Sequence, residues 1–145
     1  MEREGTTPSA LAGRLGYLLG RAHLEHRRIA EERLAPLGLR GKEFGALTIL
    51  ATEGEMSQQR LGELMGVDRT TMVAVVDALQ SAGLVERERD PRDRRAYALR
   101  ATSRGRRVLG QATTAAREAE DAFLARLPAA DRDELRRLLA ALLAP

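Results

Sequence analysis

The chain has 145 residues, 43% of them hydrophobic, which suits one folded domain with a buried core. Cysteine is absent, which excludes disulfides and thiolate metal sites, and two tyrosines with two phenylalanines are too few for the aromatic platforms that bind single-stranded nucleic acids. The net charge is +3, and neither a signal peptide nor a membrane-length apolar run is recognisable, so we expect a soluble cytoplasmic protein without membrane attachment.

The first part of the chain predicts two helices. One is expected over residues 8–35, with Thr7 as its N-cap and Pro8 at the first helical position. A second helix is expected over residues 41–52. The apolar residues of the first helix form one continuous stripe: Leu11, Leu15, Leu18, Ala22 and Ile29. Because aromatic residues are scarce, leucine, alanine and valine must fill the core, which favours packing of helix on helix.

The next segment predicts a short strand followed by a third helix. Met56 is the expected strand residue, and Ser57 is a suitable N-cap for a helix over Gln58–Met65. Gly66 ends this helix, because glycine readily adopts the left-handed conformation that closes a helix.

A fourth helix follows after a very short connection. Asp68 is its expected N-cap, the helix spans Arg69–Ser81, and Gly83 closes it. Gly62 allows close contact between the third and fourth helices, which share a set of apolar positions: Leu61, Leu64, Met65, Val67, Met72, Val75 and Leu79. This pattern predicts a helix-turn-helix. The alternative is a helical hairpin that binds no ligand.

A strongly basic β-hairpin is predicted after these helices. Residues 84–89 and 96–101 have the pattern of two strands, joined by the polar turn 90–95. Residues 84–107 contain nine arginines and four acidic residues, a local charge of +5 that exceeds the charge of the whole chain. A cationic hairpin behind a helix-turn-helix indicates binding to duplex DNA. The alternative interpretation of the turn is a solvated charged loop.

Two further helices are predicted at the end of the chain. Thr102 is the expected N-cap of a long helix that runs to about Leu127. Asp131 and Glu134 suggest a capping box for the last helix. Four leucines lie on one face of that helix: Leu135, Leu138, Leu139 and Leu142.

The helix-turn-helix and the hairpin provide the candidate DNA contacts. The fourth helix is expected to enter the major groove with its N-terminal turn first. The hairpin tip is expected to bring arginines to the minor groove, where the negative potential is concentrated. Arg69 suits a guanine and Val73 a thymine methyl group, while Thr70 and Thr71 either reach the DNA or only assist the helix cap. The full set of predicted contacts is Ser57, Gln58, Gln59, Arg69, Thr70, Thr71, Val73, Arg92, Arg94 and Arg95.

Three motifs resemble the MarR family of winged-helix transcription regulators: residues 64–71, residues 83–87 and residues 90–95 leading into 99–102. The resemblance covers about residues 8–143. It implies a mainly α winged helix-turn-helix protein with a small β-hairpin wing, in which residues 1–145 form one domain. The DNA-binding lobe would span about 37–101, and dimerisation helices about 8–35 and 102–143.

The resemblance also implies a homodimeric regulator, usually a repressor, that binds a palindromic operator and is released by a small, often phenolic, ligand. By matching position, Arg95 corresponds to the family's minor-groove arginine, Asp93 to its orienting partner and Asp68 to the cap of the recognition helix. Two departures are present. Ala74 stands where many members have Arg or Lys, and the first helix lacks the cysteine of the hydroperoxide-sensing branch.

The family architecture further implies a ligand cleft lined by residues near His23, His26, Phe44 and Thr48. His23 and His26 could instead share a metal ion, which makes a metal-responsive regulator an alternative. No third ligand completes a metal site, so no cofactor is expected. A winged helix that binds protein is another alternative, against which the basic wing argues. No nucleophile–base pair or phosphate-binding loop indicates an enzyme.

Overall fold

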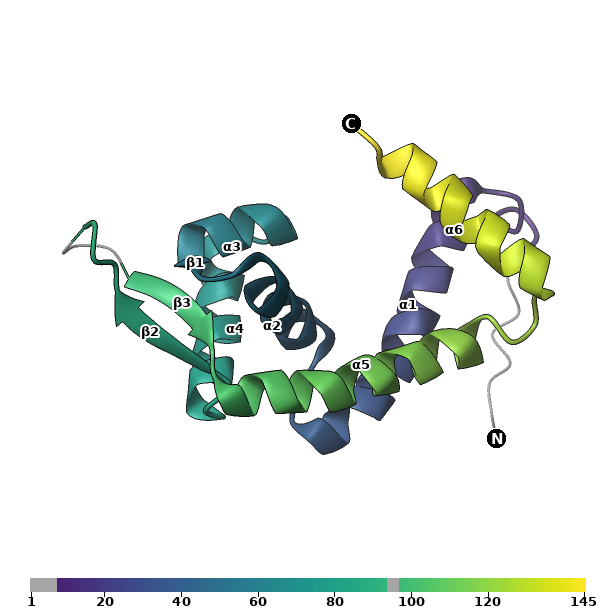
Figure 1. Ribbon diagram of the computed structural model, residues 1–145. Helices are drawn as coiled ribbons and strands as arrows, with labels where there is room; N and C mark the ends of the chain where they lie inside the picture. The colour runs from purple at the N-terminus through teal and green to yellow at the C-terminus, as the bar shows by residue number, and fades with distance from the viewer. Residues whose placement is uncertain (1–7, 94–96) are drawn as a thin grey trace.

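A computed structural model describes residues 8–93 and 97–145. Helix α5 (Ser103–Phe123) connects the two ends of the molecule (Figure 1). Helices α1 (Leu15–Leu34) and α6 (Ala129–Leu143) lie at one end, and α1 packs against α5. The short 3-10 helix η1 (Ala35–Leu37) leads from α1 to the other end.

The other end contains three helices and a small sheet. The helices are α2 (Gly41–Glu53), α3 (Gln58–Met65) and α4 (Arg69–Ser81). Within the described residues, β1 (Met56–Ser57), β2 (Val85–Arg89) and β3 (Tyr97–Ala101) form an antiparallel sheet in the order β1-β3-β2. The predicted short strand and hairpin are therefore confirmed, and the fold is a mainly α winged helix-turn-helix.

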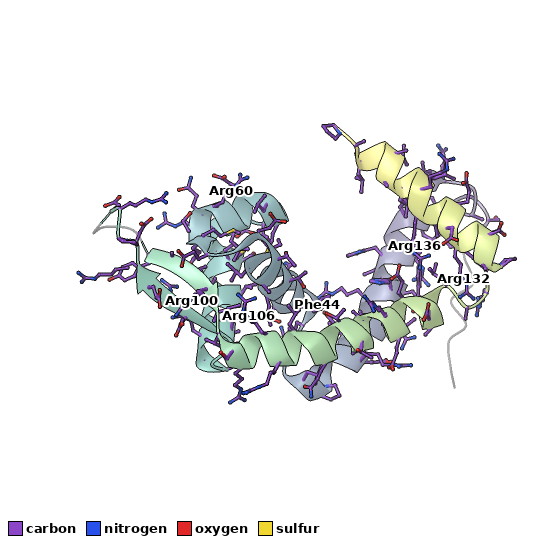
Figure 2. The ribbon with its side chains drawn as sticks, in the orientation of Figure 1. Phe44, Arg60, Arg100, Arg106, Arg132 and Arg136 are labelled. Atoms are coloured by element: carbon purple, nitrogen blue, oxygen red, sulfur yellow. The ribbon has the colours of Figure 1, made fainter. Side chains whose placement is uncertain are left out.

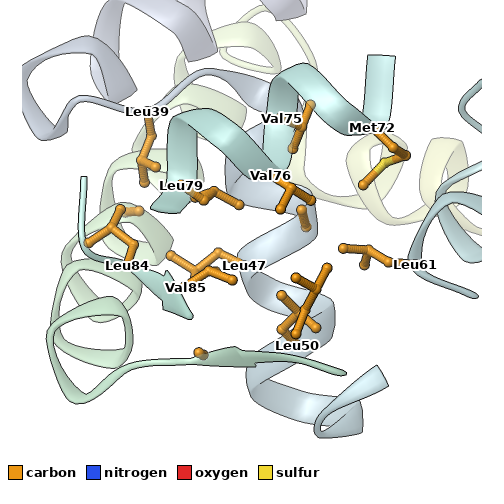
Figure 3. Close-up of a cluster of buried hydrophobic side chains, with 14 of the residues drawn as sticks. Leu39, Leu47, Leu50, Leu61, Met72, Val75, Val76, Leu79, Leu84 and Val85 are labelled. Carbon is orange, nitrogen blue, oxygen red and sulfur yellow. The ribbon is translucent and has the colours of Figure 1, made fainter. Parts of the chain in front are cut away.

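One hydrophobic core joins the helices and the sheet at this end. Leucine and valine side chains from α2, α3, α4 and the base of the hairpin meet there (Figure 3). At Gly62 there is little space between α3 and α4, because a Cβ at this position would lie 3.0 Å from Cγ of Met72. The largest fully buried side chains among the described residues are Leu34, Leu47, Leu50, Leu61, Met72, Leu79, Leu99 and Val76. The aliphatic, aromatic-poor core expected from the composition is thus observed.

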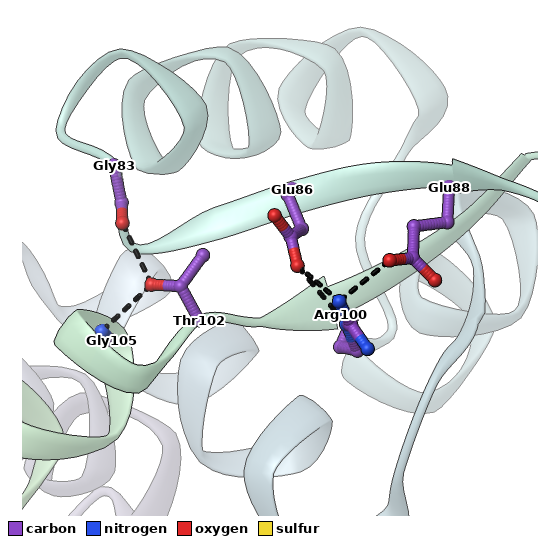
Figure 4. Close-up of polar contacts among 6 residues, drawn as sticks. All are labelled: Gly83, Glu86, Glu88, Arg100, Thr102 and Gly105. Carbon is purple, nitrogen blue, oxygen red and sulfur yellow. Dashed lines mark hydrogen bonds and ion pairs between the residues drawn. The ribbon is translucent and has the colours of Figure 1, made fainter.

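A second contact connects the base of the hairpin to the start of α5. The hydroxyl of Thr102 donates to the carbonyl of Gly83 at 2.7 Å and accepts from the backbone N–H of Gly105 at 2.9 Å, so it caps α5 as predicted (Figure 4). The backbone N–H of Thr102 donates to the Leu84 carbonyl at 3.0 Å. A Cβ on Gly105 would overlap that same carbonyl oxygen. The position therefore requires glycine for steric reasons.

The structure confirms α3 and α4 with the predicted bounds and caps and corrects the start of α1. The helix begins at Leu15 instead of Pro8, and the predicted cap Thr7 lies outside the described residues. The Pro8 carbonyl accepts from the N–H groups of Leu11 and Ala12, which makes one turn, but Arg14 is then extended with ψ 117°. Glycines on both sides of Arg14 weaken the helix there, since each costs about 1 kcal/mol relative to alanine.

The ends of the last two helices also differ from the prediction. Helix α5 ends at Phe123 instead of about Leu127, and a separate turn precedes Pro128, because a residue before proline disfavours helical conformation. The predicted capping box of α6 is wrong. The helix begins at Ala129, two residues before Asp131, and no side chain caps it.

The end formed by α1 and α6 exposes much apolar surface. In the described chain α1 buries only Leu34, and α6 buries none of its residues. Leu15 is 65% exposed and Leu142 is 70% exposed. The other exposed leucines on these two helices and the turn before α1 are Leu11, Leu18, Leu19, Leu24, Leu138 and Leu143. No helix in the described part of the chain is long and apolar enough to span a bilayer.

Candidate nucleic-acid interface

The N-terminus of α4 is held by Asp68. One carboxylate oxygen accepts from the Thr71 backbone N–H at 2.9 Å, and the other accepts from the Thr71 hydroxyl at 2.7 Å. The hydrogen bond from this hydroxyl, together with the backbone one, lowers the pKa of Asp68. The cap predicted from the sequence is confirmed, and its carboxylate remains charged near neutral pH.

The two threonines after Asp68 have different surroundings. Thr70 is exposed on the same face as Val73, which is 41% exposed, and Arg69 is exposed beside them. Thr71 is half-buried, and its hydroxyl donates to Asp68. Of the two roles predicted for Thr71, the structure shows its assistance to the helix cap.

The N-terminal turn of α3 lies beside the start of α4. Gln58, Gln59 and Arg69 line one groove of about 730 Å³ between the two helices. Ser57 caps α3 by accepting from the Arg60 backbone N–H at 3.1 Å. The fold thus places the predicted contacts of α3 next to those of α4, although they are separated in sequence by the turn.

The hairpin of β2 and β3 extends beyond the helices and forms the wing (Figure 1). At its tip, a carboxylate oxygen of Asp90 accepts from the Arg92 backbone N–H at 2.8 Å, so this carboxylate shapes the turn. The Asp93 backbone N–H donates to the Asp90 carbonyl at 3.3 Å. Arg94 and Arg95 lie outside the described residues, and so does the predicted pairing of Asp93 with Arg95.

Part of the wing's positive charge is neutralised within the wing. On one face of the hairpin, the Arg100 guanidinium donates to both Glu86 and Glu88, at 2.5 and 2.6 Å (Figure 4). The hydrogen bond with Glu86 raises the pKa of Arg100. The count of nine arginines therefore overstates the charge available to DNA.

Arg87 is the residue that the sequence interpretation missed. Its guanidinium donates to Gln80 of α4 and to Gln58 of α3, both at 3.0 Å, and lies 3.7 Å from a carboxylate oxygen of Asp77. The alternation of side-chain directions along β2 indicates this role for Arg87. Arg87 is two residues from buried Val85, so it lies on the face of the hairpin that meets the helices.

A cavity of about 460 Å³ lies between α1, the start of α2, and α4. His23 and His26 line it, as predicted, but Phe44 and Thr48 are absent from its lining. Phe44 packs against the core (Figure 2), and the Thr48 hydroxyl donates to the Phe44 carbonyl at 2.7 Å within α2. The remaining lining residues are Arg27, Ala30, Glu31, Arg40, Gly41, Lys42, Glu43, Thr71, Ala74 and Val75.

A smaller cavity of about 310 Å³ lies on the other side of the two histidines, between α1, α5 and α6. The ring of His26 contacts Phe123 edge to face, with centroids 5.4 Å apart. In the described part of the chain, no three His, Cys, Asp or Glu side chains group to hold a metal ion. The metal-responsive alternative therefore receives no support from the geometry.

The capped helix α4, its neighbour α3 and the basic wing define a winged helix-turn-helix protein. The model of the MarR family matches residues 41–97. A protein of Thauera aromatica assigned as a transcriptional regulatory protein for the hcr operon is 34% identical over 131 residues, which cover 90% of this chain and 79% of that protein. The chain belongs to the MarR family and is a DNA-binding transcriptional regulator.

Two solved structures extend the likeness over nearly the whole chain. The transcriptional repressor CouR, bound to a 23-mer DNA duplex, has a TM-score of 0.87 and 33% identity, and the match covers 94% of this chain and 96% of that one. The CouR of Rhodococcus jostii RHA1, bound to p-coumaroyl-CoA, has a TM-score of 0.80 and 29% identity, and the match covers 95% of this chain and 97% of that one.

Proposed function

We propose that this regulator is a homodimeric repressor that binds a palindromic operator and leaves it when a small aromatic acid, or a thioester of one, occupies the cavity beside α4. The observation that carries the proposal is the joint exposure of Arg69, Thr70 and Val73 next to Gln58 and Gln59, with the wing alongside. This arrangement suits a recognition helix in the major groove and a wing over the backbone or minor groove.

The unpartnered leucines of α1 and α6 support the homodimer. Exposed apolar patches of this kind are rarely left open to water in a soluble protein. A second copy related by a two-fold axis would cover both helices with the same surface. Two recognition helices would then lie about one turn of DNA apart, so half-sites are expected about 10 base pairs apart, centre to centre.

Removing Arg69 and removing Arg92 should have different effects. Arg69→Ala should cost roughly 1–3 kcal/mol on operator DNA and relax the preference at one operator position, because a base-edge contact is lost. Arg92→Ala should weaken operator and scrambled duplexes alike and reduce the salt slope by about one, because a phosphate contact is lost. Fluorescence anisotropy with both duplexes at several salt concentrations measures the two effects.

Arg137→Ala on α6 is the matched control, because that arginine is far from the wing and pairs with Glu134 of its own helix. It should leave operator binding unchanged. If Arg69→Ala and Arg92→Ala also bind both duplexes like the wild type, the assignment of the DNA surface is wrong. The same assay with Arg95→Ala tests the minor-groove arginine implied by the family motif.

The chemistry of the cavity supports an anionic ligand. Arg27, Arg40, Lys42 and two histidines line it, against Glu31 and Glu43. Glu31 already accepts from Arg27 at 2.9 Å, and Glu43 from the Arg40 backbone N–H at 2.7 Å. Cationic groups therefore remain to bind a carboxylate or phosphate of the ligand. The apolar walls of the cavity can contact an aromatic ring. The p-coumaroyl-CoA bound to the Rhodococcus CouR is a ligand of this class.

The cavity is also placed to affect DNA binding, because Thr71, Ala74 and Val75 of α4 form one wall. Titration with p-coumarate and p-coumaroyl-CoA should weaken operator binding by roughly 5–150-fold. The neutral methyl ester of p-coumarate should act more weakly, and Lys42→Met should reduce the response without changing operator affinity. If neither anion changes the melting temperature or the operator affinity, this ligand class is excluded.

A further inference from the structure

Arg87 connects three elements that are distant in sequence. It lies on β2, while its hydrogen-bond acceptors Gln58 and Gln80 lie on α3 and α4, and Asp77 of α4 lies 3.7 Å from it. Arg87 pairs across the sheet with Leu99 of β3, which is 1% exposed. The backbone of Arg87 therefore lies at the edge of the core. The contacts thus join the wing to both helices of the helix-turn-helix.

The guanidinium uses two of its three nitrogen atoms for these contacts. Nε donates to Gln80 and Nη2 donates to Gln58. A planar group with donors in a fixed fork holds two acceptors at a defined angle, which a lysine ammonium cannot do. Any change in the angle between the wing and α4 would stretch at least one of these hydrogen bonds.

The contact with Gln58 also determines how its amide is oriented. A guanidinium carries donors only, so the Gln58 atom that faces it must be the carbonyl oxygen. The amide nitrogen then remains for an external acceptor. Two N–H donors at the start of α3 suit a phosphate oxygen, which is the contact predicted for Gln58 from the sequence.

We propose that Arg87 is a positioning residue for operator binding: it holds the wing and α4 at one fixed angle and orients the Gln58 amide so that its N–H groups are presented to the DNA. Arg87 acts through these residues and is not itself a phosphate contact. The inference rests on the DNA surface proposed above, formed by α3, α4 and the wing.

The deciding variants are Arg87→Lys, which keeps the charge but loses the fork, and Gln80→Ala, which removes a neutral acceptor and leaves Arg87 intact. Arg137→Lys is the matched control, because Arg137 lies on α6, away from the wing, and pairs with Glu134 of its own helix. Operator binding by the full-length protein is measured by fluorescence anisotropy at several salt concentrations, after circular dichroism has verified folding.

Arg87→Lys should weaken operator binding by roughly tenfold, since charge-assisted hydrogen bonds are lost, while Arg137→Lys should bind the operator like the wild type. Gln80→Ala should weaken binding in the same direction. In the Arg87→Lys background, Arg92→Ala should reduce operator affinity by a smaller factor than it does in the wild type. The reason is that a wing at a different angle no longer brings Arg92 to the DNA.

Wild-type affinity and salt slope in both Arg87→Lys and Gln80→Ala would overturn the inference and leave the proposed function intact. Tighter binding by Gln80→Ala would also overturn it, because a released Arg87 would then be acting as a phosphate contact. Failure of the wild-type protein to bind any duplex would overturn the proposed function itself, and this inference with it.

Discussion

Replacing both Leu138 and Leu142 with glutamate should abolish the dimer and, with it, specific operator binding. The two leucines are 47% and 70% exposed on α6, and burial of such side chains contributes about 1.5–3 kcal/mol each. Charges at these positions would have to be desolvated in the interface. Each subunit alone would contact one half-site too weakly for specific binding, because the gain from simultaneous engagement of two sites is lost. Light scattering gives the mass, and anisotropy gives the affinity.

Arg137→Glu is a suitable control for this experiment. It changes the charge by the same amount as the two leucine substitutions but lies on the polar face of α6, where Arg137 pairs with exposed Glu134. A surface ion pair of this kind contributes little. The control should remain dimeric and bind the operator. A folded wild-type monomer at micromolar concentration would contradict the proposed assembly.

Gly105→Ala should destabilise the protein by about 2–4 kcal/mol, a large effect for the addition of one methyl group. The added Cβ would overlap the Leu84 carbonyl oxygen, and the neighbouring Leu47 side chain leaves little space for α5 to move away. The carbonyl also accepts from Thr102, so displacement of the helix would break the cap at the base of the wing. Urea unfolding at a fixed protein concentration measures the loss.

Gly110→Ala on the same helix provides the comparison. A Cβ at this position has nothing within 4 Å, and alanine is favoured over glycine in a helix by about 1 kcal/mol. This variant should be as stable as the wild type or more so. Equal stability of Gly105→Ala and Gly110→Ala would show that the start of α5 can move without cost.

Local signals predicted most of the helix-turn-helix. Ser57 and Asp68 lie directly before helices whose first-turn N–H groups need acceptors, and both side chains accept in the structure. The end of α5 was misjudged, because helical periodicity continues past Phe123 while the turn before Pro128 is set by a local backbone restriction. Periodicity alone does not show that α1 and the start of α2 lie beside the flank of α4 that carries Thr71.

The sequence by itself determined the order of the elements, the caps of α3, α4 and α5 and the concentration of arginine after α4, because these follow from neighbours a few residues apart. Only the tertiary structure decided which charges are free. Arg100 is neutralised across the hairpin by two glutamates, and Arg87 is held by side chains from α3 and α4. It also decided that His23 and His26 face a cavity with Thr71, while Phe44 joins the core. These outcomes depend on distances between elements remote in sequence, which packing of the core sets and local patterns do not encode.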